Sequence, residues 1–77
     1  MVGYKVRLRP GAIQKLWDEK GITKSYRQVS REFGCHDRMI SLYLTDQIKN
    51  PSLEMLLNWA DLLQVDYMDL IIITKDD

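Results

Sequence analysis

The feature that most constrains this chain is a pair of short amphipathic segments, joined by a glycine, within residues 25–45. Ser25 is placed to cap the first segment as a helix, because its hydroxyl can accept a hydrogen bond from a free backbone N–H of the first turn. Gly34 ends that helix after about two turns, since glycine readily adopts the positive φ that a sharp turn requires. The inward-facing positions carry residues suited to close helix packing, namely Val29, Ser30, Phe33, Cys35, Ile40 and Tyr43. The sequence therefore predicts a helix-turn-helix unit.

Helical periodicity also marks the segments on both sides of this unit. A first helix is expected over roughly residues 11–20, and His36 and Asp37 are both suitable caps for the helix that follows Gly34. Ser52 is expected to cap a fourth helix, and Asp66 a short fifth one. The fourth helix is expected to bury a stripe of apolar residues, Leu53, Leu56, Leu57, Ala60 and Leu63.

The two ends of the chain have the patterns of strands. Residues 4–9 alternate apolar and basic side chains, which is typical of a half-buried strand, and Pro10-Gly11 ends this run. Residues 71–74 are β-branched throughout. Strands at opposite ends of a short chain can pair with each other and close the domain. The expected architecture is a single domain over residues 1–77, mainly α, with five helices and two short paired strands.

The formal charge of the chain is zero, because eleven Lys+Arg balance eleven Asp+Glu. Taken alone, this balance counts against a nucleic-acid binder, which usually carries excess basic charge. The average hides a division, however: residues 1–38 hold nine bases and four acids, whereas residues 39–77 hold two bases and seven acids. The charge pattern therefore predicts an oriented molecule with one basic face and weak non-specific binding.

Other classes of protein are disfavoured by composition. One cysteine, Cys35, cannot form an internal disulfide, and the N-terminus lacks the apolar stretch of a signal peptide. The longest apolar run, residues 70–73, is far shorter than the ~18 residues that cross a bilayer, so we expect a cytoplasmic protein without membrane contact. A single histidine and a single cysteine are too few for a zinc site. No phosphate-binding loop or catalytic carboxylate pair is recognisable, so we expect no enzyme activity, cofactor, metal or small-molecule ligand.

The chain resembles the Cro/CI-type (XRE-like) helix-turn-helix domains of bacterial and phage transcriptional regulators over about residues 12–71. The resemblance rests on a series of short motifs: Lys20-Gly21-Ile22-Thr23, Val29-Ser30, Phe33-Gly34, Ile40-Ser41, Asn50-Pro51-Ser52-Leu53, Leu56-Leu57, Ala60-Asp61-Leu62-Leu63 and Val65-Asp66. It implies a lambda-repressor-like fold and sequence-specific binding of double-stranded DNA by a transcriptional regulator, in the first instance a repressor. Residues 37–45 would form the recognition helix in the major groove. A homodimer on a palindromic site is also expected, because one such helix reads only a few base pairs.

The resemblance also implies a set of DNA contacts in and around the recognition helix. Arg38 can read guanine through two hydrogen bonds, Asp37 can accept from cytosine, and Leu42 or the Thr45 methyl group can contact thymine. Members of the set outside residues 36–45 are suited to phosphates, which fix register without reading sequence. The full expected set is Lys24, Tyr26, Arg27, His36, Asp37, Arg38, Ser41, Leu42, Thr45 and Lys49.

The alternative to DNA binding is a protein-interaction module, for example an antitoxin-like partner that retains the fold without strong DNA binding, since fold alone does not decide function. Two features favour it. Asp37 places a negative charge where phosphates would approach, and Leu42 is expected to be exposed.

Two further assignments stay open at this point. Trp59 is expected on the side of the fourth helix away from its leucines, as either a dimer contact or a core residue. The basic strand residues Lys5, Arg7 and Arg9 form either a solvated face or an edge that contacts phosphates.

Overall fold

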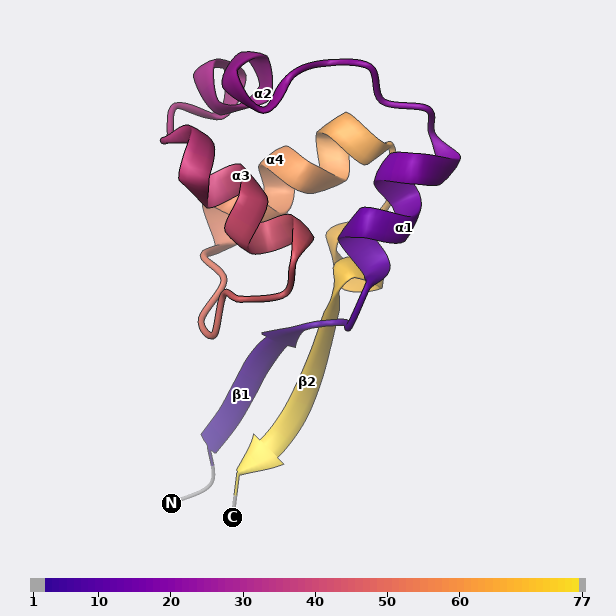
Figure 1. Ribbon diagram of the computed structural model, residues 1–77. Coiled ribbons are helices and arrows are strands. Elements are labelled where there is room, and N and C mark those ends of the chain that lie inside the picture. Colours follow the sequence, from indigo (N-terminus) through magenta and orange to yellow (C-terminus); the bar gives the residue numbers. More distant parts are fainter. Residues whose placement is uncertain (1–2, 77) are drawn as a thin grey trace.

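Within residues 3–76, the computed structural model contains four α-helices, one 3-10 helical turn and a two-stranded sheet (Figure 1). In chain order these are β1 (Gly3–Leu8), α1 (Ala12–Glu19), α2 (Tyr26–Phe33), α3 (Asp37–Leu44), α4 (Leu53–Leu63), η1 (Tyr67–Leu70) and β2 (Ile71–Asp76). The strands form a ribbon that projects from the helical body, which gives overall extents of 43 × 24 × 18 Å. No helix in this part of the chain is long and apolar enough to span a bilayer.

The expectation of five helices is wrong, because the described chain has four α-helices and a single 3-10 turn in place of the fifth. Asp66 does cap that turn, with its Oδ1 accepting from the Met68 amide at 3.0 Å. The turn is closed by the Asp69 amide, which donates to the Asp66 carbonyl oxygen at 2.9 Å. Since β2 begins at Ile71, only four residues are left for this element, and an i→i+3 turn fits where an α-helix does not.

The two strands pair antiparallel, which confirms the expected ribbon. Leu8 lies opposite Ile71, and the register continues outward to Tyr4 opposite Lys75. Residues directly opposite each other share a face, so Leu8 and Ile71 are buried together where the ribbon meets the helices. The other face of β1 carries Lys5 and Arg7.

Trp59 occupies the centre of the core, with no exposed surface. Its ring lies 6.0 Å from that of Trp17 on α1, 5.1 Å from that of Phe33 on α2, and 6.1 Å from that of Tyr43 on α3. One side chain of α4 therefore contacts an aromatic ring from each of the other three helices.

The buried face of α4 differs from the expected leucine stripe. The buried residues are Met55, Leu56, Trp59, Ala60 and Leu63, whereas Leu53 and Leu57 are 59% and 49% exposed. The placement of Trp59 away from the buried side was thus wrong, and its full burial leaves it no surface for a dimer contact. The error has a physical reason: eight of the eleven positions of α4 are apolar, so periodicity alone does not select one face.

Replacing Trp59 with alanine should lower the free energy of unfolding by about 3–5 kcal/mol, because it removes a fully buried aromatic ring and leaves a cavity. Urea unfolding followed by circular dichroism measures this loss. The matched control is Leu57→Ala on the same helix, which removes a half-exposed side chain and should cost less than about 1.5 kcal/mol. Equal effects of the two substitutions would contradict the central position of Trp59.

Candidate nucleic-acid interface

The turn between α2 and α3 has the geometry that the sequence predicts. Ser25 Oγ accepts a hydrogen bond from the Gln28 amide at 3.1 Å, which confirms the cap of α2. Gly34 has φ +71°, a conformation that side chains with a Cβ rarely adopt, and its turn is closed by the Cys35 amide donating to the Ser30 carbonyl oxygen at 2.9 Å. α2 and α3 therefore cross closely as a helix-turn-helix pair.

A polar contact between Ser30 and Asp37 fixes the start of α3 against α2. Ser30 is buried, and its Oγ lies 2.7 Å from Asp37 Oδ1 and 2.8 Å from the Arg27 carbonyl oxygen. The single hydroxyl proton is donated more strongly to the charged carboxylate. Asp37 Oδ2 also lies 4.0 Å from Arg27 Nε. The Asp37 carboxylate thus bridges the two helices, and the negative charge that seemed out of place has a structural partner.

Cys35 lies behind this turn and is partly buried. Burial raises the pKa of its thiol, and the negative charge of Asp37 raises that pKa further. A smaller fraction of this thiol is therefore ionised at a given pH than in a free cysteine. His36, which precedes α3 at the N-cap position, is exposed and makes no side-chain capping bond.

An open groove of about 610 Å³ runs beside the first turns of α3. Five of the ten expected DNA contacts line it, together with Met39: Arg27, His36, Asp37, Arg38 and Leu42. Arg38 is exposed and, among residues 3–76, has no hydrogen-bond or ion-pair partner. The structure thus gathers half of the expected set around one concave surface.

Two apolar residues of this groove differ from expectation. Leu42 is half-buried rather than exposed, and it lines the groove one helical turn after Met39. Met39 itself was not among the expected site residues. Its i, i+3 spacing to Leu42 is the signal in the sequence that places both on one side of the helix.

The remaining expected residues do not line this groove. Tyr26 is 43% exposed at the start of α2, with its ring edge-on to Trp17 at 5.8 Å. Lys24 Nζ donates to both carboxylate oxygens of Glu32 at 2.9 and 3.0 Å, so its charge is already paired. Thr45 Oγ1 donates to the Ser41 carbonyl oxygen at 2.8 Å. The Thr45 methyl group is therefore the part of this side chain that is available to contact a base.

Lys49 lies apart from this groove. It follows α3 in the connection to α4 and lines a second groove with Lys5 and Arg7 of β1. The ten expected residues therefore do not share one surface, since Lys24 also lies elsewhere, in a hollow beside Glu32 and Asp61.

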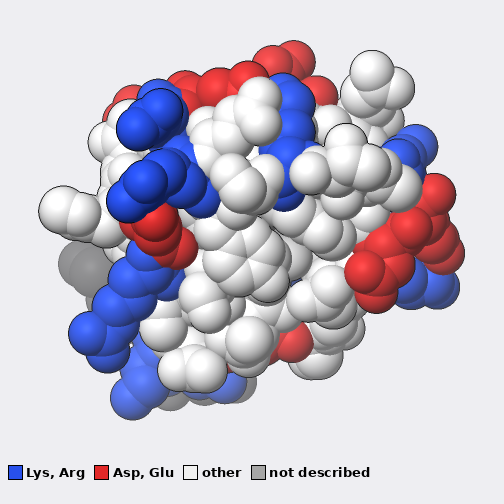
Figure 2. All heavy atoms as spheres, turned by 45° about the horizontal axis from the view of Figure 1, so that its top comes forward, with Lys and Arg blue, Asp and Glu red and all other residues white. Residues whose placement is uncertain are grey.

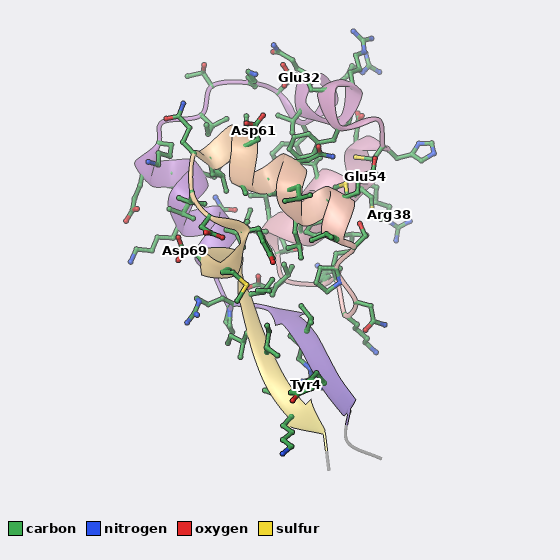
Figure 3. The ribbon with its side chains drawn as sticks, turned by 180° about the vertical axis from the view of Figure 1, so that it is seen from behind. Tyr4, Glu32, Arg38, Glu54, Asp61 and Asp69 are labelled. Carbon is green, nitrogen blue, oxygen red and sulfur yellow. The ribbon has the colours of Figure 1, made fainter. Side chains whose placement is uncertain are left out.

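Charge is unevenly distributed over the molecule. Figure 2 shows Lys and Arg side chains in a band along the left-hand edge, interrupted by one acidic group, with Asp and Glu along the top and at the right. Seen from behind, Glu54 and Asp61 lie along α4 and Asp69 on η1, whereas Arg38 projects at the side (Figure 3). The division of charge along the sequence is thus partly a division between faces.

Among the described residues, no group of three or more His, Cys, Asp or Glu side chains is placed to hold a metal ion.

Comparison with known proteins gives one informative similarity. No protein-family profile matches the chain, and no curated protein sequence matches it significantly. A solved structure, described as a "putative DNA-binding protein" from Bacteroides fragilis, is similar with a TM-score of 0.64 and 29% sequence identity. The similarity covers 94% of this chain and 100% of that one.

The raised pKa of Cys35 leads to a prediction about thiol reactivity. At pH 8 the native protein should react with iodoacetamide more slowly than the same protein unfolded in urea, because less of the thiol is ionised. Asp37→Asn should speed the native reaction, since it removes one of the two causes of the raised pKa. The matched control is Asp18→Asn on α1, which should leave the rate unchanged. An Asp37→Asn rate equal to that of the parent protein would contradict the charge effect.

Proposed function

We propose that this chain binds double-stranded DNA site-specifically through α3 and the residues around it. We further propose that it acts as a transcriptional regulator, and specifically as a repressor. The observation that carries the proposal is the setting of Arg38. It projects from the first turn of a helix whose opposite side, Ile40, Tyr43 and Leu44, is buried in the core. The similarity to a "putative DNA-binding protein" over nearly the whole chain supports the same conclusion.

The proposed recognition assigns different contacts to the exposed groups. The unpaired guanidinium of Arg38 is suited to the O6 and N7 atoms of guanine. The Thr45 methyl group and the exposed part of Leu42 are suited to the methyl group of thymine. Arg27, Tyr26 and the exposed His36 are suited to phosphates on either side of the helix. Asp37 accepts a hydrogen bond from Ser30, and the nearby guanidinium of Arg27 offsets part of its negative charge.

A homodimer forms the second part of the proposal. An eight-residue helix is about 12 Å long, which spans only three or four base pairs at about 3.4 Å each. Two copies bound about 34 Å apart would read two half-sites one helical turn from each other. Leu53 and Leu57, half-exposed and one turn apart on α4, offer apolar surface for self-association.

For the alternative, a protein-interaction module, the two features that favoured it are weaker than the sequence indicated. Asp37 has a structural partner in Ser30, and Leu42 is half-buried.

Selection of bound duplexes from a random pool tests the proposal directly. We expect an enriched palindromic site whose half-sites are centred about 10 base pairs apart. We also expect affinity for the selected duplex to fall with salt by about 0.9 log units per log unit of salt for each phosphate contact. A pool without enrichment, together with no duplex binding at low salt, would favour the protein-interaction module.

Arg38→Ala should relax the sequence preference at one position of each half-site and weaken binding by about 1–3 kcal/mol. Binding to the selected duplex and to variants with each base pair changed in turn measures both effects. Lys20→Ala, which removes an exposed base at the end of α1, serves as the control and should leave the preference unchanged. Equal weakening on every sequence would show that Arg38 contacts phosphate instead of a base.

A further inference from the structure

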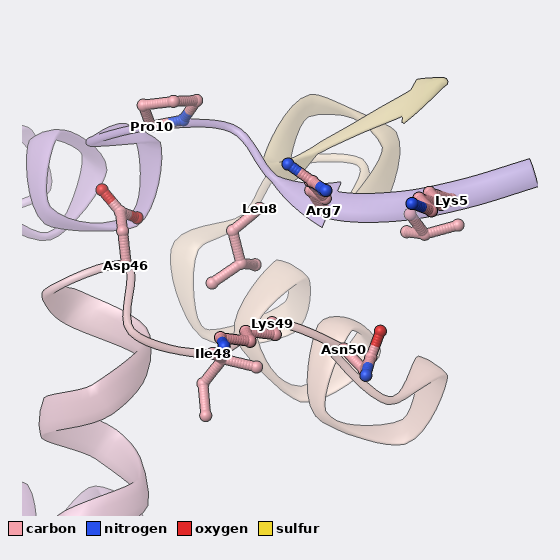
Figure 4. Close-up of a pocket in the computed structure, with 9 residues that line it drawn as sticks. Lys5, Arg7, Leu8, Pro10, Asp46, Ile48, Lys49 and Asn50 are labelled. Carbon is pink, nitrogen blue, oxygen red and sulfur yellow. The ribbon is translucent and has the colours of Figure 1, made fainter. Parts of the chain in front are cut away.

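A second groove, of about 550 Å³, separates β1 from the connection between α3 and α4 (Figure 4). Lys5 and Arg7 lie along the β1 side, and Lys49 and Asn50 lie on the facing connection. Leu8 and Ile48 contribute apolar surface between the two sides. The groove is open to solvent and joins segments that are about 40 residues apart in the sequence.

The groove is cationic. Three basic side chains line it against one acidic residue, Asp46. The Asp46 carboxylate is engaged at one end, where Oδ2 accepts a hydrogen bond from the Gly11 amide at 2.7 Å. Within residues 3–76, neither Arg7 nor Lys49 has a hydrogen-bond or ion-pair partner, and both are exposed. The groove therefore presents two unpaired positive charges to solvent.

The strand sets the spacing of the cations. Lys5 and Arg7 are two residues apart and lie on the same face of β1, opposite Thr74 and Ile72. Successive residues on one face of a strand are about 6.7 Å apart. This is roughly twice the 3.4 Å axial rise between successive phosphates of one DNA strand. Two basic side chains that leave the strand at this spacing are suited to an extended polyanion.

The groove also adjoins the proposed DNA interface. Asp46 immediately follows Thr45, the last residue of the expected recognition segment, and Lys49 lies four residues beyond Thr45. Figure 2 shows the band of Lys and Arg continuing toward the bottom of the view.

We propose that this groove binds the phosphodiester backbone of the DNA that flanks the base pairs read by α3. This inference rests on the proposed function and extends it, because it makes the ribbon part of the DNA interface. The contacts are sequence-independent: Arg7 and Lys49 neutralise phosphates and release counterions, which adds affinity without changing which bases are preferred.

The test is the double substitution Arg7→Gln and Lys49→Gln in the full chain. For the selected duplex, the plot of log affinity against log salt concentration should become less steep by about 1.8, which is about 0.9 for each of the two phosphate contacts removed. Affinity at 0.1 M salt should fall by roughly one to two orders of magnitude. The order of preference among base-pair variants should not change. The matched control is Lys75→Gln, which removes one charge from the other face of the same ribbon and should leave the slope unaltered.

Thermal unfolding of each variant checks that the fold is retained, as expected for exposed residues. If the parent chain binds duplex and the double variant keeps its slope and affinity, the groove proposal is overturned while the proposed function stands. If the parent binds no duplex, the proposed function itself fails.

The groove could also bind free phosphate ions, which carry the same charged oxygens as the DNA backbone. NMR distinguishes these two ligands. We expect the signals of Arg7 and Lys49 to shift on addition of duplex and to stay unchanged with inorganic phosphate at the same phosphate concentration. Equal shifts with both would assign the groove to small phosphate anions and overturn its assignment to DNA.

Discussion

The burial of Trp59 is the interaction on which the rest of this small structure depends. A chain of 77 residues buries only about 60–65% of its unfolded surface, so few side chains are available to hold its helices together. Trp59 contacts rings from α1, α2 and α3 at once. Only Val29 and Ser30 of α2 are buried. The contact between Phe33 and Trp59 is therefore central to the packing of α2 against the other helices. Within the described chain the indole Nε1 has no hydrogen-bond partner, a cost of about 1–3 kcal/mol that the burial of the ring offsets.

The sequence predicted those parts of the fold that local chemistry determines. Ser25 and Ser52 cap their helices, Gly34 takes the positive φ of the turn, and the two terminal strands pair. Each of these features depends on the preference of one or two neighbouring residues, or on a period of two. They are readable from a single chain for that reason.

What the sequence did not predict depends on tertiary packing. α4 is apolar on most of its surface, so its buried side was decided by the space that Trp59 fills, and the prediction chose a stripe that includes the exposed Leu53 and Leu57. The same limit applies to the interface. The partial burial of Leu42 depends on the shape of the groove that it lines, and the role of Asp37 depends on the approach of Ser30 from another helix. The meeting of β1 with Lys49 across a groove likewise has no signal in the local sequence.

The zero net charge of the chain is better understood from the ion pairs that form in the fold than from the total of its positive and negative residues. Lys24 is paired with Glu32, and Asp37 is engaged by Ser30 and Arg27. Several opposite charges are thereby satisfied inside or beside the helix-turn-helix unit. Within residues 3–76, the side chains of Arg38, Arg7 and Lys49 are left without such partners, along two adjoining grooves. A neutral chain can thus still present a basic surface where the proposed interface requires it.

The most direct test of this account is an NMR titration of the ¹⁵N-labelled chain with duplex DNA. The account predicts that the shifted backbone amides are confined to the start of α2, to α3, to the connection that follows it and to the part of β1 that faces this connection, with α4 between Glu54 and Asp61 unaffected. Shifts concentrated on the outer side of α4, or none at a salt concentration low enough for non-specific binding, would contradict it.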